Sequence, residues 1–124
     1  MERIEAFTRD GKNFIYIDVS NVKNNNDFTR IADVAQQTIG KHSENSVHTI
    51  INIENILFDT ETKEIAAKCL KHNNPYVKYS VVIGLDSIKK IMVNAVLKLS
   101  GRNKMKMHFA YTKEQAIEWL LQQV

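Results

Sequence analysis

Hydrophobic positions along the chain follow two kinds of pattern, one typical of strands and the other typical of helices. Short apolar or alternating segments occur at residues 4–8, 14–19, 47–53, 77–84 and 105–110. Segments with apolar residues at helical spacing lie at residues 27–40, 59–73, 86–101 and 112–121. The pattern therefore predicts the element order β-β-α-β-α-β-α-β-α.

The connections between these segments indicate how the strands run. Asp10-Gly11 is typical of a tight hairpin turn, so the first two strands are expected to be antiparallel. Each later strand is followed by a helix, which favours parallel strands joined by right-handed crossovers. We therefore expect an α/β fold with a mostly parallel sheet of about five strands and an antiparallel first strand. A length of 124 residues fits one domain that spans residues 1–124.

Helix boundaries are predicted from capping residues. Asp27 is expected to cap the first helix, Asp59 or Thr60 the second, and Asp86 or Ser87 the third. The third helix is expected to bury an apolar stripe that consists of Ile88, Ile91, Met92, Ala95, Val96 and Leu99.

Charge is distributed unevenly along the sequence. Residues 1–62 contain six Lys or Arg and ten Asp or Glu, whereas residues 63–124 contain eleven and four. Between residues 88 and 108 no acid accompanies the basic residues Lys89, Lys90, Lys98, Arg102, Lys104 and Lys106. A solvated helix face and a charged edge strand account for them, and an anionic partner is the alternative. Because no aromatic residue lies within this segment, a base-stacking surface for nucleic acid is not expected there.

Known catalytic and cofactor-binding motifs are absent from the sequence. It contains no glycine-rich phosphate loop and no nucleophile elbow. The four histidines are scattered, and the single cysteine, Cys69, lies on the apolar face of a predicted helix. No apolar run is long enough to span a membrane or to act as a secretory signal. We therefore expect a non-enzymatic, cytoplasmic protein without a cofactor or a metal.

Polar residues follow the predicted parallel strands, and in parallel α/β sheets ligands bind outside the carboxyl ends of the strands. Ordinary helix caps and turns explain several of these residues equally well. The candidate ligand- or partner-binding residues at this edge are Asp18, Ser20, Asn21, Asn55, Asp86 and Ser87.

Two charged residues interrupt apolar strands. Asp18 either reaches solvent at the end of its strand or contacts a ligand or partner. Lys78 would need a partner if it were buried, and Asp18 or Glu54 would supply one if the strand register allowed it. We therefore include Lys78 among the candidate binding residues.

Three stretches of sequence, at residues 14–21, 72–85 and 109–121, carry a resemblance to a known family. They read FIYIDVSN, HNNPYVKYSVVIGL and FAYTKEQAIEWLL. With the predicted element order, they resemble the STAS domain (sulfate transporter and anti-sigma-factor antagonist), and specifically the SpoIIAA-like group of small bacterial proteins. That group shares its fold with SEC14-like lipid carriers. The resemblance implies a SpoIIAA-like fold over nearly the whole chain.

The resemblance also directs attention to residues 58–62. In anti-sigma-factor antagonists, a partner kinase phosphorylates a serine in an Asp-Ser-Ser-Gly-like motif at the start of the matching helix. The matching residues here are Phe58-Asp59-Thr60-Glu61-Thr62, with neither serine nor glycine. Thr60 could accept a phosphate that the helix N-terminus would stabilise, but Asp59 and Glu61 would repel it. The alternative is that Thr60 is an ordinary helix N-cap.

The resemblance implies a regulatory or protein-interaction domain whose protein partner the sequence does not identify. SEC14 kinship implies the alternative of a small-ligand or lipid-binding module. An apolar cavity of several hundred Å³ would favour that alternative, and a solid core would favour protein interaction. An edge strand and apolar helix faces also allow a two-fold homodimer.

Overall fold

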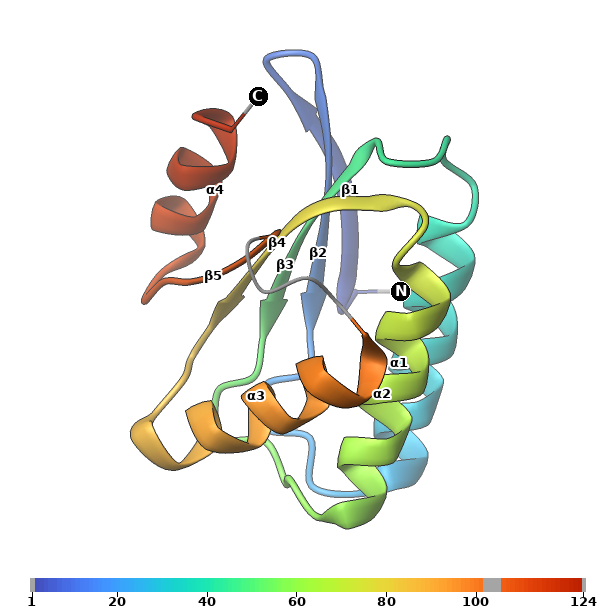
Figure 1. The fold of residues 1–124 in the computed structure, drawn as a ribbon, viewed down its shortest axis with the longest axis vertical. Coiled ribbons are helices and arrows are strands. Elements are labelled where there is room, and N and C mark those ends of the chain that lie inside the picture. The colour runs from blue at the N-terminus through green and yellow to red at the C-terminus, as the bar shows by residue number, and fades with distance from the viewer. Residues whose placement is uncertain (1, 102–105, 124) are drawn as a thin grey trace.

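A computed structural model describes residues 2–101 and 106–123 of the chain (Figure 1). In chain order, the elements are β1 (Ile4–Arg9), β2 (Lys12–Asp18), α1 (Asn25–Ile39), β3 (Val47–Asn52), α2 (Thr60–Asn73), β4 (Val77–Ile83), α3 (Ser87–Ser100), β5 (Met107–Phe109) and α4 (Lys113–Leu121).

The five strands form one sheet in the order β1-β2-β3-β4-β5. β1 is antiparallel to β2, and the other neighbours are parallel, so the predicted fold class is confirmed. The hairpin turn uses Asp10 and Gly11, which both have positive φ angles (52° and 76°). Two consecutive positive φ angles give the turn a twist that matches the twist of the flanking strands.

Helices cover the two faces of the sheet unequally, and each face has its own apolar cluster (Figure 1). Successive side chains of a strand point to opposite faces, so β1, β2, β3 and β4 each contribute to both clusters. The cluster beneath α1, α2 and α3 includes Ile15, Ile17, Ile31, Val82 and Leu97. On the opposite face of the sheet, the cluster beneath α4 contains Phe14, Ile50, Val81, Ile83, Ala116, Ile117 and Leu120.

Helix α4 is held at its carboxyl end by a residue from the first hairpin. The Lys12 ammonium donates hydrogen bonds to the backbone carbonyls of Leu120 (3.2 Å), Leu121 (3.1 Å) and Gln123. A cation at this end of a helix is favourable because the last carbonyls have no partner within the helix. Lys12 therefore connects the beginning of the sheet to the last helix.

The cap of the first helix differs from the prediction, while the caps of α2 and α3 are among the residues predicted for them. Asn24, and not Asp27, is the N-cap of α1: its side-chain oxygen accepts from the Asp27 N–H at 2.9 Å. Both residue types cap helices well, so composition alone did not choose between them. Asp59 is the N-cap of α2, which makes Thr60 the first helical residue. Asp86 is the N-cap of α3.

The predicted buried stripe of α3 is wrong in large part. Ile91 and Leu99 are 74% and 65% exposed, and Ala95 is exposed as well. Val93 and Leu97 point into the core instead, together with the predicted Val96. The side chain of Ile88 lies outside the described part of the structure. The helix is apolar on two sides, so hydrophobic spacing did not determine which side faces inward.

The last strand is shorter than the predicted segment 105–110. β5 covers only Met107–Phe109, while Ala110 follows it as a loop residue that donates its N–H to the Val82 carbonyl. Met105, Arg102 and Lys104 lie outside the described residues. In the part that is described, no helix has both the length and the apolar character needed to cross a membrane.

Candidate functional site

The carboxyl ends of β2, β3 and β4 lie next to one another. Asp18 at the end of β2 pairs with Asn52 of β3, which pairs with Ile83 of β4. The segments after these ends form one polar edge of the sheet. We call this edge the rim and define it as residues 18–24, 52–60 and 84–87.

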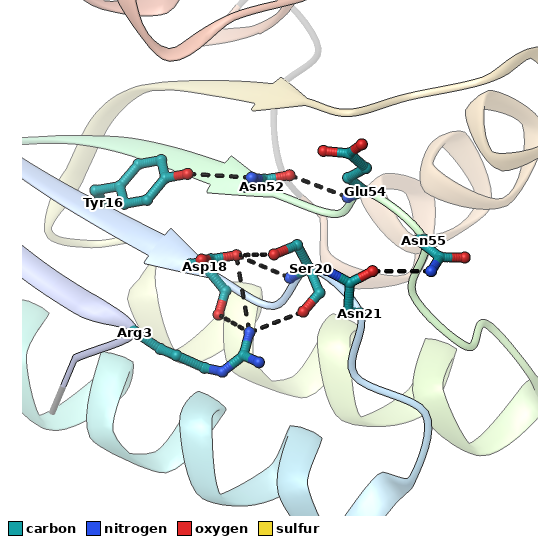
Figure 2. Close-up of polar contacts among 8 residues, drawn as sticks. All are labelled: Arg3, Tyr16, Asp18, Ser20, Asn21, Asn52, Glu54 and Asn55. Atoms are coloured by element: carbon teal, nitrogen blue, oxygen red, sulfur yellow. Dashed lines mark hydrogen bonds and ion pairs between the residues drawn. The ribbon is translucent and has the colours of Figure 1, made fainter.

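Asp18 is held in place by the loop that follows it (Figure 2). Its Oδ1 atom accepts hydrogen bonds from the Ser20 backbone N–H (2.9 Å) and from the Ser20 hydroxyl (2.5 Å). Aspartate side chains commonly bind the backbone two residues ahead and so fix a turn. The Asp18 carboxylate therefore orders the first loop of the rim, and about a third of its surface stays exposed (31%).

Arg3 completes this arrangement from the start of the chain (Figure 2). Its guanidinium donates to the backbone carbonyls of Ser20 (2.8 Å) and Asp18 (3.2 Å) and lies 3.8 Å from the Asp18 carboxylate. Because both side chains are partly exposed, the ion pair itself contributes little to stability, and the carbonyl contacts fix the loop. Arg3 was not predicted, since nothing near residue 3 in the sequence distinguishes it from other surface arginines.

Two asparagines join the first and second loops of the rim. Asn21 and Asn55 both have positive φ angles (62° and 55°), which asparagine tolerates better than most residues. The Asn55 side-chain amide donates to the Asn21 side-chain oxygen (2.8 Å), and the Asn21 N–H donates to the Glu54 carbonyl (2.9 Å). Lys23 donates to the Asn55 side-chain oxygen at 2.9 Å. The two loops therefore behave as one unit, and the side chains of both asparagines remain exposed.

Asn52 links the sheet to the second loop. Its amide nitrogen donates to the Tyr16 hydroxyl (3.1 Å), and its oxygen accepts from the Glu54 N–H (3.0 Å), as Figure 2 shows. Partial burial raises the pKa of Tyr16 above its ordinary value of 10, so the hydroxyl keeps its proton at neutral pH. Gly84 packs against the same loop with φ of 78°, and a Cβ there would lie 2.7 Å from the Glu54 nitrogen. Only glycine fits at this third loop of the rim.

The amino end of α2 continues the rim. The Asp59 carboxylate accepts from the Thr62 N–H (2.9 Å) and the Thr62 hydroxyl (2.8 Å), and the Asn25 amide donates to it from α1 (3.2 Å). These hydrogen bonds, led by the one from the Thr62 backbone, lower the pKa of Asp59. A negative charge is therefore fixed at the amino end of α2. Thr60 is exposed beside it.

The structure brings all of the predicted site residues except Lys78 to the rim. Asp86 and Ser87 begin α3, where Asp86 accepts from the Lys89 N–H (2.8 Å) as an ordinary cap. Lys78 lies at the opposite end of the sheet, at the amino end of β4. It is about five residues from the level of Asp18, or roughly 16 Å. The suggested pairing of Lys78 with Asp18 or Glu54 is therefore wrong.

His48 is the most unusual polar group outside the rim. It is 4% exposed, and its Nδ1 atom has no hydrogen-bond partner. Its ring lies between those of Phe14 and Tyr79, at centroid distances of 5.6 and 6.0 Å. Burial, with the nearby charges of Lys12 and Lys78, lowers the pKa of His48 from 6.5 to about 4. The ring is therefore neutral at pH 7.

The chemistry available at the rim is that of binding. In the described ranges 2–101 and 106–123, no three His, Cys, Asp or Glu side chains gather closely enough to hold a metal ion. The polar side chains of the rim described above are hydrogen-bond donors and acceptors that are already held in place by one another. Such a surface can recognise a partner with little further ordering.

An apolar cavity lies in the cluster beneath α1, α2 and α3. Its volume is about 90 Å³, and Phe28, Cys69, Leu70 and Leu97 are among the residues that line it. Typical ligand pockets have volumes of about 300–1,000 Å³. The core is therefore close to solid.

The sheet order, the antiparallel first strand and the single helix on one face define a STAS-type fold. Among solved structures, the chain is similar to an anti-sigma-factor antagonist (STAS) domain protein from Planctomyces limnophilus, with a TM-score of 0.56. The match covers 94% of this chain and 97% of that chain at 11% sequence identity. This confirms the predicted SpoIIAA-like fold, while identity this low says nothing of function. No protein-family model and no curated protein matches the sequence.

Proposed function

We propose that the chain is a non-enzymatic regulatory domain of STAS type, which acts in the cytoplasm by binding a partner protein through the rim. The observation that carries the proposal is the set of hydrogen bonds between the first two loops of the rim. Asp18 and Arg3 fix one loop, and the contact between Asn21 and Asn55 fixes it to the next. Polar groups that are held in place and still exposed lose little entropy when a partner binds.

Phosphorylation is not part of this proposal. In the family, a phosphoserine at the start of the second helix supplies a switchable negative charge. Here residues 58–62 contain no serine, and Asp59, which matches the aspartate of the family's motif, already accepts the N–H of Thr62. A phosphate on Thr60 would meet the carboxylates of Asp59 and Glu61 on either side. Partner binding would then be constitutive and would not depend on a kinase.

The lipid-binding alternative has less support. A cavity of about 90 Å³ is far below the several hundred Å³ that a lipid or a large metabolite needs. A nearly solid core agrees better with a domain that uses its surface.

Affinity capture with rim variants tests the proposal. The double variant Asn21→Gly/Asn55→Gly removes two exposed side chains, and glycine adopts the positive φ angles without strain. Asn45→Gly is the matched control because Asn45 is also exposed and has φ of 54°, but lies in the loop before β3, away from the rim. Each protein is used to capture partners from its native cytoplasm, and the captured proteins are quantified by mass spectrometry.

The expected result is a discrete protein that wild type and Asn45→Gly retain equally, and that the double variant retains at least about tenfold less. Urea unfolding of all three proteins shows whether their stabilities match. Equal capture by the double variant at unchanged stability would refute binding through the rim. Recovery of only a lipid or a metabolite would favour the alternative function.

A further inference from the structure

Helix α3 carries an apolar ridge on the side that faces away from the core. The ridge consists of Ile91, Ala95 and Leu99, which we call the α3 stripe, and all three residues are exposed. Their spacing of four residues places them in one row about 12 Å long. Val93, Val96 and Leu97 already pack into the core from the other side of the same helix. A helix that is apolar on both sides is normally covered on both sides.

The surroundings of the α3 stripe are basic. Lys90 and Lys98 are exposed on the same helix. From Ser87 to Lys113 the sequence contains seven Lys or Arg and no Asp or Glu. Lys89 lies 3.9 Å from Asp86, whereas Lys90 and Lys98 form no ion pair with the described residues. A partner that covers the stripe therefore meets positive charge at these two lysines.

We propose that the α3 stripe docks an amphipathic helix of a partner protein, with Asp or Glu residues beside that helix's apolar ridge, where it meets Lys90 and Lys98. The inference rests on the proposed function, because it names a second contact surface for the same kind of partner. A row of residues spaced by four is the ridge that inserts into the groove of a packed helix. Ala95, at the centre of the row, is small enough for the two backbones to approach closely. The carboxylates of the partner would pair with Lys90 and Lys98.

A second copy of this chain fits the surface less well. Two-fold pairing of α3 with α3 would bring Lys90 and Lys98 of both copies together with no acid between them. Like charges at such close range are unfavourable. Pairing of the basic α3 surface with the acidic first half of another copy would be head-to-tail, which does not close into a dimer.

A membrane surface also fits less well. Ile91 and Leu99 are the only two large side chains of the stripe, and together they offer fewer carbon atoms than one acyl chain. A single myristoyl chain already gives only marginal membrane binding.

Fluorescence anisotropy with the full chain and three labelled synthetic peptides tests the inference. The peptides, of about 20 residues each, share one leucine ridge at a spacing of four and differ only in flanking residues, which are Glu, Gln or Lys. The test variant is Ile91→Gln/Leu99→Gln. Tyr111→Gln is the matched control, because Tyr111 is an exposed apolar side chain (86%) in the loop before α4, outside both the rim and α3.

We expect wild type to bind the Glu peptide at least about tenfold more tightly than the Gln or Lys peptide, with an affinity that falls as salt rises. The double variant should lose about tenfold or more of this affinity, and Tyr111→Gln should keep it. No binding of the Glu peptide, or equal binding of all three, would overturn the inference. So would sedimentation as a dimer that the double variant abolishes, or tighter binding to phosphatidylserine vesicles.

The same double variant separates this inference from the proposed function. If it captures the native partner as well as wild type does, while the rim variant does not, the α3 inference fails and the rim proposal stands. If the rim variant captures the partner normally and the α3 variant does not, the rim proposal fails.

Discussion

Replacing His48 by phenylalanine should make the stability of the protein less dependent on pH. The imidazole is buried between the rings of Phe14 and Tyr79, and its pKa is lowered from 6.5 to about 4. In the unfolded chain the ring is hydrated and takes up a proton as the pH falls through 6.5. The folded state takes up that proton only near pH 4, so protonation favours the unfolded state between these two values.

The size of the effect follows from the two pKa values. A shift of one pKa unit corresponds to about 1.4 kcal/mol. At pH 5 the lowered pKa of His48 reduces the free energy of unfolding by about 2 kcal/mol, relative to its value above pH 6.5. Near pH 4 the loss reaches about 3 kcal/mol. Above pH 6.5 both states are neutral, and His48 then contributes no pH dependence.

Urea unfolding at pH 7.5 and at pH 5 measures this quantity. Between the two pH values, the free energy of unfolding of wild type should fall by about 2 kcal/mol more than that of His48→Phe. Phenylalanine preserves the stacking with Phe14 and Tyr79, and its slightly larger ring changes the stability at both pH values alike. His72→Gln, which changes an exposed histidine, is the control and should lose as much as wild type.

A difference between wild type and His48→Phe below about 0.5 kcal/mol would refute this reasoning. It would mean that His48 is hydrated in the folded state, or that a partner for Nδ1 stabilises its charged form. An NMR titration of the His48 ring gives the folded pKa directly and distinguishes between these two causes.

Two further variants test how the loops and the last helix are held. Gly84→Ala should destabilise the protein by about 2 kcal/mol or more, because its φ of 78° is strained for alanine and the new Cβ would lie 2.7 Å from the Glu54 nitrogen. Unchanged urea unfolding would contradict this packing. Lys12→Met keeps the apolar stem but removes the hydrogen bonds to the carbonyls of Leu120 and Leu121, and should cost up to about 1 kcal/mol. Faster hydrogen exchange in α4, with other amides unaffected, is expected, and unchanged exchange would show that Lys12 does not hold the helix.

Much of the fold could be predicted because its signals are local. Asp10-Gly11 indicates the hairpin regardless of what surrounds it, and Thr112 precedes a helix whose Gln115 N–H it caps (3.1 Å). The alternation of strand and helix then leaves few topologies, since parallel neighbours need crossovers of one hand. The order β1-β2-β3-β4-β5 itself was not predicted, because crossovers of one hand fix the face on which a helix lies and leave the order of the strands open.

The failures share a different physical cause, which is that they depend on contacts between distant residues. The buried side of α3 was wrong because the helix has two apolar faces and only packing decides between them. Lys78 lies at the amino end of β4, away from the rim, and its distance from Asp18 depends on how the strands align in the sheet. Arg3 binds carbonyls that lie in the loop after β2. Asn21 and Asn55 were predicted as rim residues, but their contact with each other was not.

The placement of α4 has a consequence for synthesis of the protein. The ribosome makes α4 after every strand of the sheet, yet among the helices of residues 2–101 and 106–123 only α4 covers Phe14, Ile50 and Val81 on its face of the sheet. Until residues 113–121 leave the exit tunnel, the nascent sheet must expose that apolar surface to other chains. Translational pausing or premature termination before residue 113 would therefore yield a chain that chaperones must shield or proteases remove.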